Sequence, residues 1–392
     1  MNHHLIPQVI RQELVAAHAL QLGAMASGGL SGAWIWKAQS PQGPVALRGW
    51  PAEHPNPQRL SQIHCAMRSA RQLGMENIPR IFVNRQGASF TSDGQRLWEL
   101  TQWMPGAADY AQCPSRPRLQ SALRALAELH AAWQAAASSV APNLELDRGP
   151  MTDYTSAAAV RSWAGSAAAA TVGPSPTVAE RRHRLELCLQ QQQTWRSYVM
   201  GNTMGHTSQA SGATVWAGSA WPGATGEGSA HEVSQSNAAA IMWLAQQTLV
   251  HLAAQGPQLL QRLIDVQATA VPLHFVLRDV WSDHILFTDD QVTGIIDFGA
   301  ARVDEPATDV ARLLGSLEPL DATRWLVGWQ AYHAHNPLVD LERVQLLDRV
   351  GTLLAAVQWL QWLVIEPRQF DVPAQQLVDR WQRLLQRLEA SW

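Results

Sequence analysis

The sequence has few charged residues, little net charge and no paired cysteines. The low net charge argues against nucleic-acid and membrane partners, and the cysteine spacing argues against disulfide-stabilised and zinc-binding proteins. Charged residues make up 16% of the 392 residues, against roughly a quarter in typical domains. The formal net charge of −3 provides no positive field for nucleic acid or an anionic membrane. Cys65, Cys113 and Cys188 are scattered, which argues against a disulfide framework or a zinc site. Small molecules and proteins remain as partners.

The chain has no long hydrophobic run, and its first residues do not show the pattern expected of a signal peptide. Its longest strongly apolar stretch, residues 352–365, is interrupted by Gln358 and Gln361 and is too short to span a bilayer. We therefore expect a buried helix there and no membrane partner. The first residues, MNHHLIPQVIRQEL, have no basic region followed by an apolar core, as a signal peptide requires. A cytoplasmic protein is the expectation.

The N-terminal part has the pattern of a small antiparallel sheet. Residues 8–22 have helical apolar spacing, and a glycine-rich turn follows at 23–32. Residues 57–73 have a proline near their start and Gly74 just past their end, which is the asymmetry expected of a helix. Candidate strands lie at 33–38, 44–50, 78–83 and 96–103. We assign residues 1–103 to an N-terminal lobe.

Helical patterns dominate the remainder, which we assign to a C-terminal lobe over residues 104–392. Candidate helices lie at 118–133, 175–195, 238–264 and over most of 322–392. Residues 200–237 contain many Gly, Ser and Ala and neither Lys nor Arg, and we expect a disordered insertion there. The order of elements predicts the α+β class, with one helix packed on the small sheet and a larger, mostly helical second lobe.

The segment 277–298, LRDVWSDHILFTDDQVTGIIDF, contains the residues expected to carry chemistry. Asp279 and Asp297 each follow a short apolar strand, so both carboxylates should face one cleft. In phosphoryl transfer one Asp accepts the proton of the substrate hydroxyl and another holds the magnesium that bridges the nucleotide phosphates. The spacing D-x4-H-x12-D-F-G comes after a glycine turn, a V-A-L-R strand and a helix, in kinase order. Two aspartates that merely cap turns are the alternative, and their joint spacing disfavours it.

These motifs resemble those of the aminoglycoside phosphotransferase and choline kinase-like family of phosphotransferase enzymes, of which the chain would be a divergent member. The family shows H-G-D-x4-N, a hairpin, I-D-F-G/E and a further Asp followed by Leu-Ala. Here GIIDFG at 294–299 and DVARL at 309–313 match. The resemblance implies a protein-kinase-like two-lobed fold whose N-terminal lobe binds nucleotide, with ATP and Mg as cofactors and a small-molecule hydroxyl as acceptor.

The resemblance also implies roles for individual residues. Asp279 would be the catalytic base, Asp297 the principal metal ligand, and His284 would occupy the second metal position. The nucleotide phosphates would be contacted by Gly28, Gly29, Ser31 and Arg48.

Two departures from the family pattern lie in the catalytic loop. Leu277 and Arg278 replace the family's His-Gly before the catalytic Asp. His284 stands where the family has Asn, and imidazole is a poor ligand for Mg²⁺, which prefers oxygen. His284 could instead donate to a phosphate or fill the loop.

A third departure concerns the lysine that kinases use to bind phosphate. Arg48 occupies its slot, and an arginine can grip phosphate in a fork, although its geometry is not a lysine's. Lys37 is the only lysine of the chain, and we interpret it as an exposed strand residue. The helix at 57–73 contains no acidic residue, whereas kinases use a Glu there, so Glu53 or Glu76 would have to pair with Arg48, or the pair is absent.

Two hypotheses about function stay open. The first is an enzyme, an ATP-dependent O-phosphotransferase with an alcohol group as acceptor, and the second is a pseudokinase that binds nucleotide or a protein partner without turnover. Acidic residues outnumber basic ones over 246–392, which favours a cationic acceptor, although an ordinary solvated surface would give the same count. We interpret Asp304 and Asp309 as structural, with Asp309 as the N-cap of a helix running to Leu317.

Overall fold

The computed structural model describes residues 5–25, 32–139, 172–208, 229–370 and 372–390. Contacts between residues divide the chain into two units, each with its own interior. The first comprises Met1–Ser175 with Thr269–Val344, and the second comprises Pro176–Ala268 with Gln345–Trp392. The lobe boundary expected between residues 103 and 104 falls inside the first unit, and it stays a prediction.

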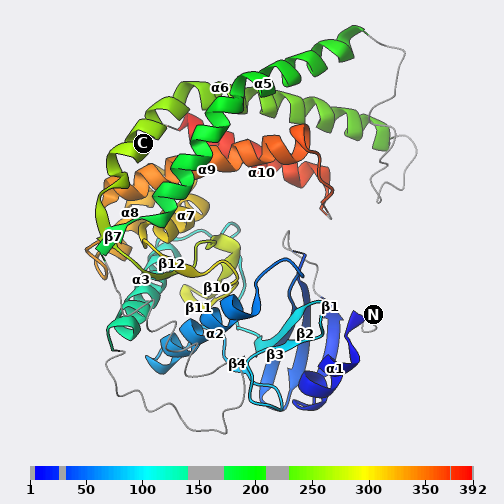
Figure 1. The fold of residues 1–392 in the computed structure, drawn as a ribbon, viewed down its shortest axis with the longest axis vertical. Coiled ribbons are helices and arrows are strands. Elements are labelled where there is room, and N and C mark those ends of the chain that lie inside the picture. Colours follow the sequence, from blue (N-terminus) through cyan, green and yellow to red (C-terminus); the bar gives the residue numbers. More distant parts are fainter. Residues whose placement is uncertain (1–4, 26–31, 140–171, 209–228, 371, 391–392) are drawn as a thin grey trace. The chain divides into compact units, whose positions relative to one another are not determined.

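A six-stranded antiparallel sheet forms the N-terminal part of the first unit (Figure 1). Its order is β1-β2-β3-β6-β4, with β5 paired to β6. The strands are β1 (Gln21–Met25), β2 (Trp34–Ser40), β3 (Gly43–Gly49), β4 (Ile81–Phe82), β5 (Thr91–Ser92) and β6 (Leu97–Gln102). The predicted hairpin is β2–β3, which pairs from Trp34 with Gly49 to Ser40 with Gly43.

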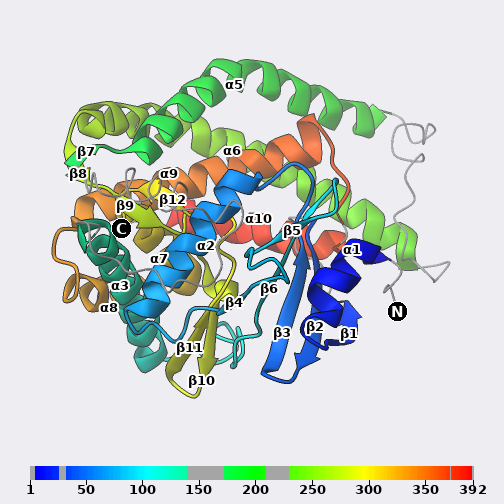
Figure 2. The ribbon, with the colours of Figure 1, turned by 60° about the horizontal axis from the view of Figure 1, so that its bottom comes forward.

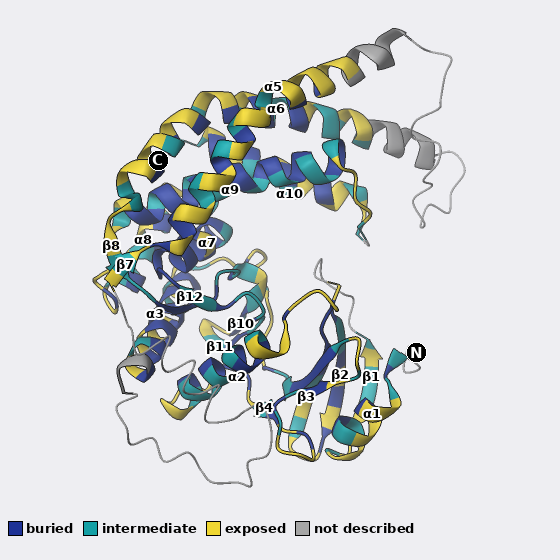
Figure 3. Cartoon of the chain, in the orientation of Figure 1, coloured by how far each residue is buried: buried dark blue, intermediate teal, exposed yellow. Residues whose placement is uncertain are grey.

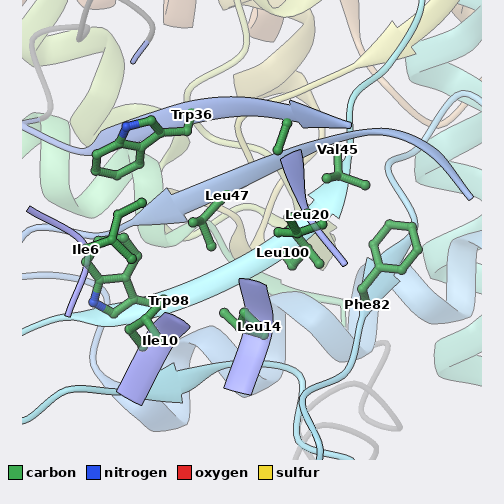
Figure 4. Packing of buried hydrophobic residues seen from close by; sticks show 11 residues of the cluster. Ile6, Ile10, Leu14, Leu20, Trp36, Val45, Leu47, Phe82, Trp98 and Leu100 are labelled. Carbon is green, nitrogen blue, oxygen red and sulfur yellow. The ribbon is translucent and has the colours of Figure 1, made fainter. Parts of the chain in front are cut away.

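One face of this sheet is covered by the N-terminal helix. The helix consists of α1 (Gln8–Ile10) and the π-helical turn η2 (Arg11–Ala16), and Figure 2 shows it against the outer strands. Ile10 and Leu14 pack on Trp36, Leu47 and other buried residues of the sheet (Figure 4). The helix predicted over residues 8–22 ends earlier, because β1 begins at Gln21 and pairs with β2.

Helix α2 (Pro57–Gln72) begins where the sequence predicts. The side chain of Asn56 caps it by accepting a hydrogen bond from the Arg59 backbone N–H at 2.8 Å, and proline occupies the first turn, where no helical bond is lost. The indole of Trp133 donates to the Ala66 carbonyl at 2.9 Å. Helix α2 is thereby fixed between the sheet and the helix that contains Trp133.

The rest of the first unit consists of short two-stranded sheets and the helices beside them. The hairpin of β10 (Ile285–Thr288) and β11 (Gln291–Ile295) lies beside α3 (Arg116–Ser139). β9 (His274–Val276) pairs with β12 (Arg302–Asp304), and β7 (Val172–Pro174) pairs with β8 (Ala270–Pro272). A 3₁₀ turn, η3 (Ser282–His284), precedes β10. Helices α7 (Ala307–Leu317) and α8 (Ala322–His333) follow, and α7 is almost entirely buried (Figure 3).

The second unit is helical. It contains α5 (Pro176–Ser208), α6 (Ser229–Gln267), α9 (Leu341–Leu360) from Gln345 onward, η4 (Gln361–Ile365) and α10 (Ala374–Glu389). The helix expected at 352–365 is present as the end of α9 with η4, and most of its aliphatic side chains are buried. Among the described helices, none is both long and apolar enough to cross a bilayer.

We expected a disordered insertion over residues 200–237, but both ends of this range are helical. Helix α5 continues to Ser208 and α6 begins at Ser229, because adding residues to an existing helix costs much less than starting one. Residues 209–228 lie outside the described part of the chain. The antiparallel N-terminal sheet with one helix and the helical C-terminal region nevertheless confirm the predicted fold class.

Candidate active site

The two aspartates predicted to carry chemistry lie in loops that His284 joins. Asp279 follows β9 and Asp297 follows β11. The His284 ring nitrogen Nδ1 lies 2.8 Å from the carbonyl oxygen of Asp279, and Nε2 lies 3.7 Å from Oδ2 of Asp297. The His284 carbonyl also accepts a hydrogen bond from the Ile296 N–H at 3.0 Å. The loop after β9 and the loop after β11 are therefore held together.

Both ring nitrogens of His284 have partners. The indole N–H of Trp281 donates to Nε2 at 2.8 Å, while Nδ1 donates to the Asp279 carbonyl. The tautomer that satisfies both hydrogen bonds is the neutral ring protonated on Nδ1. A metal ion at Nε2 would have to displace Trp281. The metal-ligand role of His284 stays a prediction, and the geometry gives the ring a second task in aligning the two loops.

Asp297 has the environment of an ionised carboxylate. Burial alone would raise its pKa, but the charge of Arg48, together with hydrogen bonds from Arg48 and from the Gly299 N–H, lowers it below the usual range. The side chain is 37% exposed, and its Oδ1 lies 3.3 Å from Nη1 of Arg48. Its backbone is left-handed, with φ of 63°, a conformation that Asp and Asn tolerate better than most residues. The carboxylate is thus charged and accessible.

The glycine after Asp297 is required by close packing. A Cβ on Gly299 would lie 2.8 Å from a ring carbon of Trp50. Trp50 also contacts Arg48, whose guanidinium carbon lies 4.6 Å from the indole centroid. Trp50 therefore connects the Asp-Phe-Gly turn with the arginine in the lysine slot.

The acid that pairs with Arg48 is Glu99, so the expectation of Glu53 or Glu76 is wrong. Glu99 lies on β6 directly opposite Arg48 on β3, and Oε1 is 3.7 Å from Nε of Arg48. Its other oxygen, Oε2, lies 2.7 Å from Nε2 of His64 on α2. Sequence reasoning missed both Glu99 and His64 because it searched the helix for an acid. The register of β3 with β6 contained the signal, since residues directly opposite on antiparallel strands share a face.

The carboxylate of Asp279 is paired with the guanidinium of Arg312 on α7. Both side chains are 46% exposed, and solvent-exposed pairs of this kind contribute only about 0–1 kcal/mol. Arg312 belongs to the matched segment DVARL. The pair leaves Asp279 reachable from solvent and places a cation next to it.

Asp309 does not cap α7, contrary to our expectation. Pro306 occupies the cap position, and the buried Asp309 carboxylate accepts the backbone N–H groups of Leu277 at 2.6 Å and Arg278 at 2.7 Å. His130 lies 3.1 Å from the same carboxylate. A single cap bond is weaker than this set of contacts, so tertiary structure determines where the side chain points. Asp309 therefore holds the backbone that precedes Asp279.

Arg278 adopts a backbone conformation that favours glycine. Its φ is 66°, and it occupies the position where the resembling family has Gly. Its guanidinium is paired with the fully buried Asp304. The backbone bond to Asp309 and the side-chain pair with Asp304 together offset the cost of the left-handed conformation.

Replacing Asp309 by Asn is expected to lower the free energy of unfolding by about 3 kcal/mol, because an amide at this fully buried position cannot accept from two backbone donors and also satisfy His130. Chemical denaturation followed by circular dichroism measures the change. The exposed Asp265, which accepts a hydrogen bond from Gln261, is the control, and its Asn variant should change stability by less than about 0.5 kcal/mol. Equal losses in the two variants would contradict the role given to Asp309.

With this geometry in view, the sequence matches the profile of the phosphotransferase enzyme family over residues 26–347. The chain belongs to the phosphotransferase enzyme family. The match includes Arg48, Asp279 and Asp297, and it confirms the resemblance proposed from the sequence. Among curated protein sequences, none matches this family member.

Several solved structures share the fold of this phosphotransferase family member. One is an aminoglycoside phosphotransferase from Alicyclobacillus acidocaldarius, at 15% identity and a TM-score of 0.50, covering 98% of this chain and 94% of that one. A spectinomycin phosphotransferase in complex with ADP and spectinomycin has 11% identity and a TM-score of 0.53, covering 99% and 97%. An amicoumacin kinase in complex with AMP-PNP and Ca²⁺ has 9% identity and a TM-score of 0.52, covering 98% and 93%.

The remaining predicted site residues of this family member fall elsewhere. Gly28, Gly29 and Ser31 lie outside the described residues. Lys37 is exposed on β2, with its ammonium 4.8 Å from the ring centroid of Trp103, so it is stacked on an aromatic ring that follows β6. The structure thus brings together Arg48, His284 and Asp297, and His284 connects them to Asp279.

Proposed function

We propose that this chain is an ATP-dependent phosphotransferase that moves the γ-phosphate of the nucleotide to a hydroxyl of a small molecule. Membership of the phosphotransferase enzyme family supports the reaction class. The observation that carries the proposal is the convergence of an ionised Asp297 with Arg48, in a loop that His284 joins to Asp279. Phosphoryl transfer needs three such groups, namely a carboxylate that acts as the base, a carboxylate that binds the metal and a cation that binds the phosphates.

Each residue has a definite task in this proposal. Asp279 accepts the proton of the acceptor hydroxyl, because its carboxylate is exposed and the preceding backbone is fixed by Asp309. Arg48 binds phosphate oxygens through the edge of its guanidinium that does not face Glu99. Asp297 holds the divalent metal with an oxygen ligand.

The residues present fit a nucleotide with Mg²⁺. Magnesium in such sites is bound by one or two carboxylates together with the substrate phosphates, and Asp297 is a charged, accessible carboxylate beside an arginine that can bind the same phosphates. When bound, Mg²⁺ would neutralise charge that develops on the phosphoryl oxygens. The ligands bound in two solved structures with this fold, ADP in one and AMP-PNP with Ca²⁺ in the other, support a nucleotide and a divalent metal.

The acceptor is the least constrained part of the proposal. The acidic excess over 246–392 favours a cationic alcohol, and spectinomycin in a structure of the same fold is compatible with a small-molecule acceptor. Arg312, however, places an exposed cation directly next to Asp279. A cationic group of the acceptor would therefore have to bind away from the base.

A pseudokinase is the second candidate, and specific contacts favour it. The base is already paired with Arg312, and Nε2 of His284 already accepts from Trp281. Such a protein would bind nucleotide, or a protein partner, without turnover. A cytoplasmic location stays a prediction for either function.

A two-stage experiment tests the proposal. The midpoint of thermal unfolding is measured with ATP, with and without Mg²⁺, and ADP release is then followed with a panel of aminoglycosides, choline, homoserine and sugar amines. A ligand present at 100 times its Kd should stabilise the protein by about 2.7 kcal/mol, and at least one acceptor should raise ADP release. No response to nucleotide in any condition would sink the proposal, and binding without turnover would favour the pseudokinase.

A further inference from the structure

Arg48, Glu99 and His64 form a chain of contacts that runs from the interior to the site. The three residues come from β3, β6 and α2. The side chains are 17% exposed in Arg48, 6% in Glu99 and 1% in His64. Glu99 uses one oxygen for each neighbour, at 3.7 Å from Nε of Arg48 and 2.7 Å from Nε2 of His64. The arginine is thus the outer end of a buried polar chain.

Within the described part of the chain, His64, the innermost of these three residues, has a single hydrogen bond that fixes its ring, the one to Glu99. The other ring nitrogen of His64, Nδ1, is buried and has no hydrogen-bond partner among the described residues. The ring packs near Phe90, with centroids 6.2 Å apart. The orientation of the imidazole and the position of the Glu99 carboxylate therefore depend on each other.

Glu99 is ionised although it is buried. Burial would raise its pKa, but the hydrogen bond from His64 and the charges of His64 and Arg48 lower it. A buried carboxylate that lost one of two partners would have to move, take up a proton or admit water. Removing the donor on His64 should therefore change where Glu99 holds Arg48.

The guanidinium of Arg48 is restrained on two sides by the protein. Its Nε edge faces Glu99, and its face covers the indole of Trp50 at 4.6 Å. Nη1 points to Asp297 at 3.3 Å. Because a guanidinium is planar and has five N–H donors, one edge can be fixed while the others bind phosphate. A lysine ammonium in this slot has no such second edge.

The ion pair between the phosphate-binding cation and a carboxylate is built differently here than in protein kinases. There the lysine of the strand is paired with a glutamate of the following helix. Here the carboxylate is on the neighbouring strand, and the helix contributes the imidazole that holds the carboxylate. The helix keeps an influence on the phosphate-binding cation, now through Glu99.

We propose that His64 is a positioning residue that sets the guanidinium of Arg48 for nucleotide phosphate through Glu99. The inference rests on the proposed function, because it assumes that Arg48 binds phosphate. The alternative is that His64 and Glu99 serve only to attach α2 to the sheet. In that case their substitution would lower stability and leave nucleotide affinity unchanged.

Calorimetric titration with Mg²⁺ and AMP-PNP tests the proposal on the full chain. In His64→Leu the hydrogen-bond donor is lost, and the Kd should rise about tenfold, the lower end of what partners that orient a binding group contribute. In His64→Gln the side-chain amide can still donate to Glu99, and the Kd should stay within about twofold of wild type. Equal Kd values for His64→Leu and wild type would overturn the positioning role.

A double-mutant cycle separates this role from general weakening of the fold. In an Arg48→Met background, His64→Leu should no longer change the Kd, because the group through which it acts is absent. A tenfold effect that persists there contradicts the proposal. Should His64→Leu fail to fold, Glu99→Gln replaces it in the same cycle with the same expectations. If wild type itself does not bind, the proposed function fails together with this inference, whereas wild-type binding with unaffected variants overturns the inference alone.

Discussion

The Asp279→Asn variant should lose catalytic rate by about 10²–10⁴-fold while its affinity for Mg²⁺ and ATP stays within about twofold, if Asp279 acts as a general base. Asparagine has the same shape but accepts no proton from the acceptor hydroxyl. The substitution also removes the charge that Arg312 pairs with, yet an exposed pair contributes only about 0–1 kcal/mol. The effect should therefore appear in kcat and not in the unfolding midpoint. ADP release with a saturating acceptor measures it.

Asp283→Asn is the matched control for this variant. Asp283 lies in the turn that follows Asp279 and is exposed, and its carboxylate contacts the hydroxyl of the neighbouring Ser282. Its Asn variant should keep its kcat within about twofold, as expected for a surface position. Undiminished ADP release by Asp279→Asn would show that another group takes the proton.

The second large effect is expected for Asp297→Asn. Asparagine keeps the left-handed backbone of this position, with φ of 63°, at little cost, whereas alanine would add strain. Loss of the charge should weaken binding of the metal and nucleotide together by about 100-fold or more. Stabilisation by ATP should then become independent of Mg²⁺, which thermal unfolding with and without the metal measures.

Asp289→Asn serves as the control for Asp297→Asn. Asp289 also has a left-handed backbone, with φ of 52°, in the turn between β10 and β11. It is exposed, and its side chain takes no part in the site. This variant should retain a Mg²⁺-dependent response, so that strain at a positive φ is separated from loss of the metal ligand. A magnesium response that survives in Asp297→Asn would remove Asp297 from the metal site.

Local patterns predicted the elements of the site well. The hairpin β10–β11, the positions of Asp279 and Asp297 at strand ends and the start of α2 all follow from short stretches of sequence, because turns, caps and alternation are local. The profile match over residues 26–347 confirms the family that these motifs suggested. The phosphate-binding roles of Gly28, Gly29 and Ser31 stay predictions.

What the sequence did not predict depends on contacts between distant segments. Glu99 and His64 are 35 positions apart, and no local pattern joins a strand carboxylate to a helix imidazole. Asp309 had the spacing of a helix cap, but a buried carboxylate satisfies more donors at Leu277 and Arg278. Cross-strand register would have found Glu99, and it follows once β3 and β6 are paired.

The loop before Asp279 has a consequence for the evolution of this branch of the family. In this loop Arg278 has a left-handed backbone conformation, and its guanidinium forms an ion pair with the buried Asp304. Glycine at 278 would relieve the backbone and leave the acid buried without that cation, whereas a neutral residue at 304 would leave the arginine strained and unpaired with this partner. Neither single change is favourable, so positions 278 and 304 are expected to covary among related sequences. Searches that demand glycine before the catalytic aspartate would overlook such sequences.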